Sequence, residues 1–326
     1  MTASATACRV CGSPSVTVAG RVEYLEGVPH IIQDCDECGC RFTTHDPAVH
    51  DRLHTRPAIS YYDDYRVLAE RSRDRFRAGD SEGLRAELSR STKYRFIIEH
   101  VSGQPQSARL LEIGCARGHL TSYFVLMGRP ILGVDVSTEA IGSARAAFGD
   151  HFAVGLDAVR PPYDVIYHVG LIGCVADPIG LTRRLLAMLK PGGTLLFNAP
   201  NRDALRLQGQ LWLDSAPPPD LVTLFPAGFW QSRVPDGVVV VEHVEMLDTE
   251  ASMAVAARCL AGVRWRRPSP APFDSGAHAW SQPATDARVV VARAIARLAR
   301  TLRLSGLAGP RPAEFGLLVS MSPRIA

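Results

Sequence analysis

The chain has 326 residues, of which 46% are hydrophobic and 21% are charged, an ordinary composition for a globular protein. No apolar run approaches the ~20 residues of a membrane span. The N-terminus also lacks the basic start and apolar core of a secretory signal, so we expect a cytoplasmic protein. Lysine and arginine number 36 against 33 aspartates and glutamates, an excess too small to indicate a nucleic-acid partner.

Cysteine is concentrated at the N-terminus, where five of the eight cysteines fall in the first 40 residues. Four of them belong to two Cys-x-x-Cys-Gly turns, Cys8–Gly12 and Cys35–Gly39. Each turn directs two thiolates at one point, and its glycine permits the left-handed conformation that such turns need. Four thiolates are the closed tetrahedral set of a structural zinc, and disulfides are the weaker alternative in a reducing cytosol. The predicted zinc ligands are Cys8, Cys11, Cys35 and Cys38.

The segment between the two turns is predicted to be a hairpin, because Val16–Leu25 and Pro29–Gln33 alternate in polarity around a Glu-Gly turn. Together with the cysteine turns, this pattern resembles a zinc ribbon, which we expect to span residues 1–45. Cys40 is a spare thiol that could replace Cys38, but the spacing of the turn argues against the exchange. A closed four-sulfur site offers no open position to a substrate, so we expect the metal to hold the fold together.

Residues 46–107 are predicted to form a helical linker or lid. Three tyrosines, the last of them Tyr65, begin a helix that runs to about Arg77. These tyrosines either pack the helix onto the core or form a lid, whose aromatic faces would attract a cation and exclude water. A second helix, Thr92–Val101, carries Tyr94 on a face that could look into a ligand site.

The sequence LLEIGCARGHL predicts a strand at Arg109–Ile113, a turn at Gly114–Gly118 and a helix at His119–Met127. This order sets backbone N–H groups and a helix N-terminus beside whatever ligand binds there. Glu112 closes this strand, and Asp135 ends the next one. An acid at the second strand end can accept both ribose hydroxyls of an adenosine ligand, because one carboxylate accepts two O–H donors.

The turn indicates which adenosine ligand to expect. A dinucleotide fingerprint needs three glycines, but Ala116 and His119 occupy two of their positions, which leaves a pyrophosphate little room. The pattern Glu-x-Gly-x-Ala-x-Gly instead resembles motif I of the class I methyltransferases that use S-adenosylmethionine, with alanine in place of their usual middle glycine. The resemblance implies this cofactor, held by Glu112, Gly114, Gly118 and Asp135.

Beyond the turn, strands and helices alternate, which is typical of a doubly wound parallel α/β sheet. The predicted elements lie at 109–113, 119–127, 131–135, 138–147, 151–156, 163–168, 179–189 and 194–198. The sequence Lys-Pro-Gly-Gly at 190–193 is a stop signal for the helix before it. Asp157 follows the third strand, where it either binds an adenine amino group or is a solvated loop acid.

The resemblance extends to YDVIYH and LLAMLKPGGTLLFNAPN, which look like the later motifs of class I methyltransferases. Trp212 and the PPPDL segment after it resemble a subgroup with an N-terminal zinc ribbon, whose known members modify sugars and other natural products. This implies a Rossmann-like sheet of seven strands, formed by residues 108–249 and 313–326. Strands at 238–244 and 315–320 would pair antiparallel, with a helical insertion at 250–312 between them.

Two departures from that subgroup concern proton transfer. Its members often have a Leu-Glu-His triplet after the fourth strand, but Gly170–Cys174 contains neither an acid nor a base. They also often have a histidine where this chain has Asp220. His168, at the carboxyl end of the fourth strand, is the first candidate for a general base, and its alternative is a packed, hydrogen-bonded histidine. Asp220 is the second candidate, and Asn198 is expected to orient the substrate.

We therefore expect an S-adenosylmethionine-dependent methyltransferase with a structural zinc, acting on a small molecule in natural-product or sugar biosynthesis. The alternatives are RNA methylation, which the near-neutral charge disfavours, a reaction in which the cofactor's own amine attacks its side chain, and cofactor binding without catalysis. A helix at Asp286–Leu304 has an arginine face that is either solvated, a basic surface or a homodimer contact. The predicted catalytic residues are His168, Asp220, Asn198 and Tyr65; the predicted cofactor-binding residues are Glu112, Gly114, Gly118, Asp135, Asp157, Tyr94 and His168.

Overall fold

The computed structural model of the chain describes residues 6–23, 29–44, 63–203, 205, 211–213, 218–233, 238–244 and 316–323. The predicted insertion at 250–312, with its two helices, lies outside the described residues. The chain divides into two compact units, which are considered separately. The first unit comprises Met1–His45, Pro200–Phe229 and Val244–Leu317, and the second comprises Asp46–Ala199, Trp230–His243 and Leu318–Ala326.

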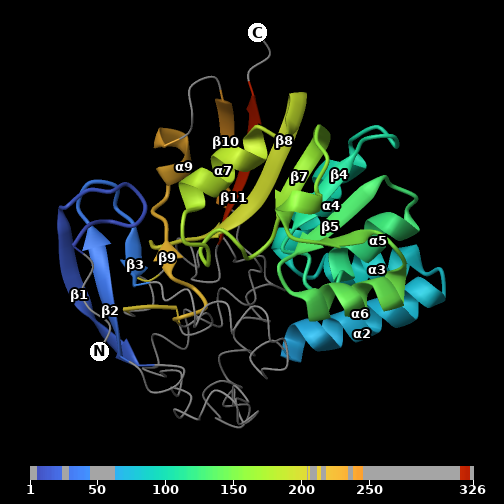
Figure 1. The fold of residues 1–326 in the computed structure, drawn as a ribbon, viewed down its shortest axis with the longest axis horizontal. Helices are drawn as coiled ribbons and strands as arrows, with labels where there is room; N and C mark the ends of the chain where they lie inside the picture. Colours follow the sequence, from blue (N-terminus) through green and yellow to red (C-terminus); the bar gives the residue numbers. More distant parts are fainter. Residues whose placement is uncertain are drawn as a thin grey trace, which may run out of the picture. The chain divides into compact units, whose positions relative to one another are not determined.

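The second unit is built around a seven-stranded sheet with the order β10-β11-β8-β7-β4-β5-β6 (Figure 1). The strands are β4 (Leu110–Ile113), β5 (Ile131–Asp135), β6 (Phe152–Val154), β7 (Tyr163–His168), β8 (Leu189–Pro200), β10 (Val238–Val244) and β11 (Gly316–Pro323). Strands β4 to β8 pair in parallel. The chain runs outward from β4 to β6 and returns to β7 on the other side of β4, which confirms the predicted doubly wound sheet. Ligands of such sheets bind at this reversal, outside the carboxyl ends of the strands.

Three helices connect the parallel strands: α5 (His119–Leu126), α6 (Thr138–Phe148) and α7 (Pro178–Leu186). The side chain of Ser137 accepts the N–H of Ala140 at 3.2 Å and begins α6. The side chain of Asp177 accepts the N–H of Gly180 at 2.8 Å and begins α7, whose first residue is a proline. Helices α6 and α7 therefore each start where a side chain satisfies a free N–H group, and in α7 a proline also fits the first turn.

The prediction for the end of α7 was wrong. The helix ends at Leu186, and the Pro-Gly-Gly stop signal falls inside β8, which already begins at Leu189. Leu189 pairs with Tyr163, and the register then shifts so that Thr194 pairs with Val165. The irregularity absorbs the proline and the two glycines, which are tolerated in a strand at such a bulge.

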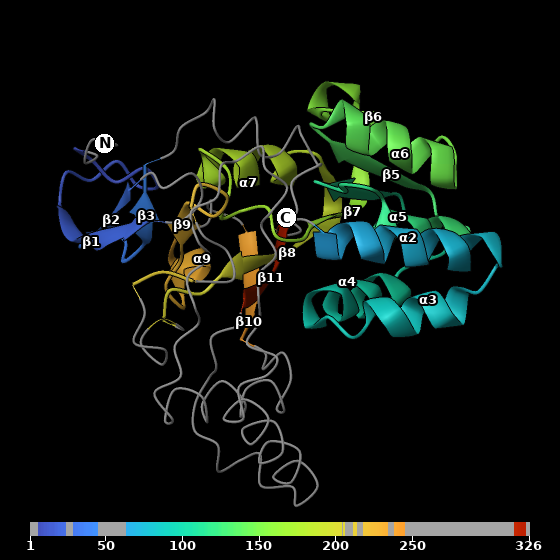
Figure 2. The same cartoon turned by 90° about the horizontal axis from the view of Figure 1, so that it is seen from below.

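One face of the sheet packs against α3 (Ser81–Leu88), α4 (Thr92–Ser102) and α5. The side chains from the strands are those of Leu110, Ile131, Val165, Tyr167 and Leu196, and those from the helices include Leu84, Leu88, Ile97, Ile98, Val101, Leu120 and Phe124. Figure 2 shows α2 (Asp63–Arg77), α3 and α4 beside α5. No helix of the described residues is both long and apolar enough to cross a membrane.

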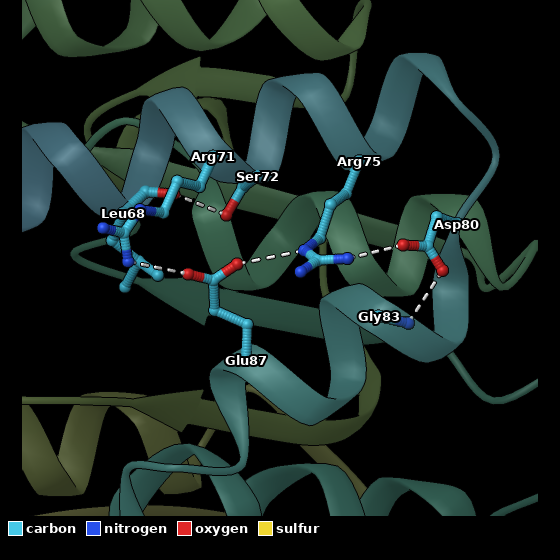
Figure 3. A network of polar contacts seen from close by, with 7 residues as sticks. All are labelled: Leu68, Arg71, Ser72, Arg75, Asp80, Gly83 and Glu87. Carbon is cyan, nitrogen blue, oxygen red and sulfur yellow. Dashed lines mark hydrogen bonds and ion pairs between the residues drawn. The ribbon is translucent and has the colours of Figure 1, made fainter.

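Helix α3 was not predicted, and an ion network joins it to α2 (Figure 3). Glu87 accepts hydrogen bonds from Arg71 at 3.2 Å and from Arg75 at 3.0 Å. Arg75 also contacts Asp80 at 2.5 Å, and Asp80 caps α3 by accepting the N–H of Gly83 at 2.8 Å. Asp80 therefore both begins α3 and ties that helix to α2.

The first unit contains a four-stranded sheet with the order β1-β2-β3-β9. Its strands are β1 (Val16–Glu23), β2 (Pro29–Cys35), β3 (Arg41–Thr43) and β9 (Thr223–Leu224). Strands β1 and β2 form the predicted hairpin, and β2 pairs antiparallel with β3. The fourth strand comes from a distant part of the chain and pairs antiparallel with β3.

The network of Figure 3 leads to a prediction about Glu87. Burial alone would raise the pKa of this carboxyl, but the hydrogen bonds and charges of Arg75 and Arg71 outweigh burial and hold the pKa below its usual value. A pKa that is lower in the folded state adds stability above the unfolded pKa, and this stability is lost as the pH falls through the folded pKa.

We expect Glu87→Gln to lower the free energy of unfolding by about 1 kcal/mol at neutral pH, and the difference from wild type to vanish below about pH 3. Urea unfolding at both pH values measures it. The control is Glu82→Gln, which changes an exposed acid of the same helix. A difference that persists at the lower pH would contradict the ionic origin of the effect.

Candidate functional site

The candidate site begins at the turn that joins β4 to α5. The turn has a positive φ at three alternate positions, 71° at Gly114, 47° at Ala116 and 80° at Gly118. Glycine adopts this region freely, whereas alanine does so at a cost of about 1–2 kcal/mol. A Cβ at Gly118 would lie only 2.5 Å from the ring of Phe152, so this position also needs glycine for packing. The two glycines singled out by the sequence pattern therefore have a geometric reason.

Asp135, at the end of β5, is fixed beside this turn. Its Oδ2 accepts the N–H of Ala116 at 2.8 Å, and its Oδ1 accepts the N–H of Ser137 at 2.9 Å. The side chain is only partly buried. Each carboxylate oxygen can accept more than one donor, so the group is oriented by the backbone and still able to bind hydroxyl groups.

Glu112 lies deeper than the sequence suggested, with 3% of the residue exposed. Its Oε2 accepts hydrogen bonds from the hydroxyl of Thr121 and from that of Tyr167, the latter at 3.3 Å. Burial, and to a smaller extent the charge of Asp135, raise the pKa of Glu112 to about 7 against the lowering effect of these hydrogen bonds. Tyr167 is the register partner of Glu112 in the β4–β7 pair, so aligning the two predicted strands could have found it.

Tyr94 and His119 form a buried pair between α4 and the first residue of α5. The hydroxyl of Tyr94 lies 2.7 Å from Nε2 of His119, and the two rings meet edge to face. Burial, followed by the charge of Lys93, lowers the pKa of His119 to about 4, so the imidazole is neutral at physiological pH. Tyr94 was predicted from the sequence as a site residue, but His119 was not. The signal that could have found His119 is a polar residue at the start of an apolar helix.

His168 ends β7 and is completely buried. Its ring stacks on Phe197 at 4.8 Å between centroids, and neither ring nitrogen has a hydrogen-bond partner among the described residues. Burial lowers the pKa of His168 to about 3, which makes it a weak proton acceptor. Its role as a general base stays a prediction, and the packing favours the alternative of a core histidine, although not the hydrogen-bonded one.

The other predicted residues lie in different surroundings. Asn198 is partly buried, and its side-chain oxygen accepts the N–H of Gly170 at 2.7 Å, which ties β8 to the loop after β7. Asp157 is fully exposed and lies 3.5 Å from Arg184. Asp220 is buried and belongs to the first unit, whereas the residues above belong to the second. Only the backbone of Tyr65 is described, within α2.

The two cysteine turns of the first unit converge as predicted. The sulfur atoms of Cys8, Cys11, Cys35 and Cys38 all lie within 4.8 Å of one another. The Cys8–Cys38 and Cys11–Cys35 sulfur pairs are 3.7 and 3.6 Å apart. Four sulfurs at about 2.3 Å from a tetrahedral zinc would be about 3.8 Å apart, so the spacing fits that ion.

The two turns also share one backbone geometry. The N–H of Gly12 donates to the carbonyl of Cys8 at 2.8 Å, and that of Gly39 donates to the carbonyl of Cys35 at 2.9 Å. Both glycines have a positive φ, 76° and 71°. The hydrogen bond to Cys38 and then burial raise the pKa of the Cys8 thiol, a penalty that a bound cation would reverse.

Part of the chain matches a known protein family. Residues 84–236 match the family model of the methyltransferase domain. The match covers slightly less than half of the chain and includes the strands β4 to β8 and the glycine turn.

Individual relatives are more distant. The ubiquinone biosynthesis O-methyltransferase of Burkholderia ambifaria is 32% identical over 114 residues, 32% of this chain and 47% of that protein. The enzyme of the same name from Bordetella bronchiseptica is 28% identical over 116 residues, with 32% and 48% covered. The chain thus spans about half the length of the curated relatives it matches.

Solved structures give weak similarities. The plantazolicin methyltransferase BpumL in complex with SAH is 14% identical over 85% of this chain and 97% of its own, with a TM-score of 0.40. The CcbJ methyltransferase from Streptomyces caelestis is 21% identical over 32% of this chain and 51% of its own, with a TM-score of 0.30.

The geometry of the turn predicts opposite effects for two small substitutions. Gly118→Ala should lower the free energy of unfolding by about 2–3 kcal/mol, because the new methyl group meets Phe152 at a positive φ. Ala116→Gly should be neutral or stabilise by up to about 1 kcal/mol, since glycine relieves the strain at φ 47°. Urea unfolding of both variants measures the difference. Equal destabilisation by both would show that the turn has another conformation.

Proposed function

We propose that this protein is an S-adenosylmethionine-dependent methyltransferase. The observation that carries the proposal is the carboxylate of Asp135, oriented by the N–H groups of Ala116 and Ser137 at the rim of the glycine turn. The turn follows β4, and the strand order reverses between β4 and β7, where sheets of this type bind ligands. The methyltransferase-domain match of residues 84–236 supports the same cofactor.

The cofactor, when bound, supplies a methyl group on a positively charged sulfur, and the acceptor's lone pair displaces that sulfur as a neutral thioether. In this proposal Asp135 accepts the two ribose hydroxyls, and the open side of the Gly114–Gly118 turn admits the rest of the ligand. Glu112 does not touch the ligand but holds α5 and β7 together beneath the turn. Alignment and exclusion of water are the main tasks left to the protein.

We propose a small molecule as the acceptor, in natural-product or sugar biosynthesis. The balance of 36 basic against 33 acidic residues supports this over RNA, which is bound through many phosphate contacts. The curated relatives are named as O-methyltransferases of ubiquinone biosynthesis, and this name also points to a small-molecule acceptor. We propose Asn198 and Asp220 as the residues on the acceptor side, and the sequence pattern alone supports this.

We also propose that Cys8, Cys11, Cys35 and Cys38 bind one structural zinc. Their sulfur spacing supports this, and so does the pair of backbone N–H groups that lie 3.4 Å from sulfurs. All four positions of a tetrahedral ion would be filled by the protein, which leaves none for a substrate.

Our prediction for Asp135 isolates the ribose contact. Asp135→Asn should weaken binding of S-adenosylhomocysteine about 10- to 100-fold by calorimetry, the loss of a charge-assisted hydrogen bond. Removal of the ligand's 2′-hydroxyl should weaken binding to wild type but cost little more in the variant. The matched control is Asp74→Asn, at an exposed acid of α2 that has no predicted role in binding. If the two losses simply add, Asp135 does not contact that hydroxyl.

A second prediction concerns the reaction type. Incubation with labelled cofactor and a metabolite extract should yield S-adenosylhomocysteine and a labelled acceptor, both identified by mass spectrometry. Methylthioadenosine formed from the cofactor alone would instead mean attack by the cofactor's own amine, and it would contradict methyl transfer.

The metal proposal predicts one zinc per chain in the purified protein by elemental analysis. Cys35→Ser should lose it, because a three-thiolate site binds zinc far more weakly. Cys174→Ser, at a buried cysteine outside the cluster, is the control and should keep the ion. Full retention of zinc in Cys35→Ser would contradict the ligand assignment.

A further inference from the structure

The ribbon is joined to a segment that lies far from it in the sequence. Strand β9 has only two residues, Thr223 and Leu224, and its strand partner in the sheet order is β3. The N–H of Thr43 extends this pairing to the carbonyl of Val222 at 3.0 Å. Two residues cannot form a stable strand alone, so the shape of this segment depends on β3.

Arg202 connects the segment directly to the metal-binding turn. Its guanidinium donates to the carbonyl of Gly39, which belongs to the second cysteine turn, and lies 3.2 Å from the carboxylate of Asp34. Its backbone N–H donates to the carbonyl of Phe225 at 2.8 Å. One residue thus holds the cysteine turn with its side chain and the end of β9 with its backbone.

The cysteine turn also packs directly on the segment. A Cβ at Gly39 would lie 3.2 Å from Pro226, so the glycine lets the two approach closely. The same turn has the positive φ of 71° described above, and its Cys35 and Cys38 are proposed zinc ligands. A change in the conformation of this turn would therefore alter its contacts with both Arg202 and Pro226.

A partly buried ion pair joins β2 to β3, the strand that pairs with β9. Asp34 and Arg41 are register partners in β2 and β3 and form two hydrogen bonds of 2.8 and 2.7 Å. Arg41 also donates to the carbonyl of Leu211 at 3.1 Å.

We propose that the metal centre orders not only the ribbon but also residues 218–229, through the contacts of Gly39 with Arg202 and Pro226 and the pairing of β3 with β9. This rests on the proposed zinc site. Asp220, the buried acid that is a proposed acceptor-side residue, lies within the same residues. The ordering does not extend to the glycine turn, whose hydrogen bonds lie within the second unit.

Hydrogen exchange on the full chain, with zinc content measured first, tests this proposal. Removal of zinc by a chelator should speed exchange of the amides in 218–229 at least about tenfold, while those in 110–135 keep their protection. Affinity for S-adenosylhomocysteine should change less than about twofold, since its proposed contacts lie in the second unit. Arg202→Ala should produce the same local loss of protection with zinc still bound, a result that a general loss of stability would not give.

The control variant is Arg77→Ala, at an exposed arginine of α2, which should leave both regions protected. A protein purified without zinc would overturn the metal proposal itself. Zinc that is present but leaves 218–229 equally protected after removal would overturn the coupling alone. Loss of protection in both regions at once would also overturn it, because the metal would then support the whole chain.

Discussion

The structure of the second unit depends on the hydrogen bonds that hold the turn after β4 against the end of β5. Three positive φ values give this turn little conformational preference of its own. It is fixed because Gly114 and Cys115 donate their N–H groups to the carbonyl of Val134 at 2.8 and 3.0 Å, and Ala116 donates to Asp135. The last of these bonds offsets the strain of an alanine in a left-handed conformation. The same bond aims the carboxylate, so one interaction shapes the turn and prepares the group proposed to hold the ribose.

The two acids near this turn have been given different roles by their environments. Glu112 is buried against Tyr167 and Thr121, where its carboxyl has a pKa of about 7. Asp135 stays at the rim, and its charge is one cause of the raised pKa of Glu112. Two carboxylates at one sheet edge would repel each other if both faced the ligand. Burying one as a partner of hydroxyl groups leaves a single acid for the ligand, a division that the sequence pattern alone could not reveal.

The sequence predicted those features whose causes are local. The parallel strands, the glycine turn and the two cysteine turns follow from periodicity and from residues a few positions apart, and each is found in the structure. What was missed depends on distant partners. The burial of His168 depends on Phe197, the pairing of Tyr94 with His119 on the approach of two helices, and the start of β8 on its register with β7. Strand β9 has too few residues to be seen without β3.

The two units differ in what stabilises them. The second unit buries a continuous apolar core between its sheet and helices, in which Leu110, Ile98 and Leu120 are fully buried. The ribbon cannot do this, because its hairpin leaves Val18 62% exposed and buries the polar Gln33. A small unit of this kind needs another source of stability, and the metal proposed at the four thiolates would supply it. Strand β9 pairs with β3 of the ribbon. In the coupling proposed above, residues 218–229 therefore depend on the metal centre for their stability, and not on the apolar core of the second unit.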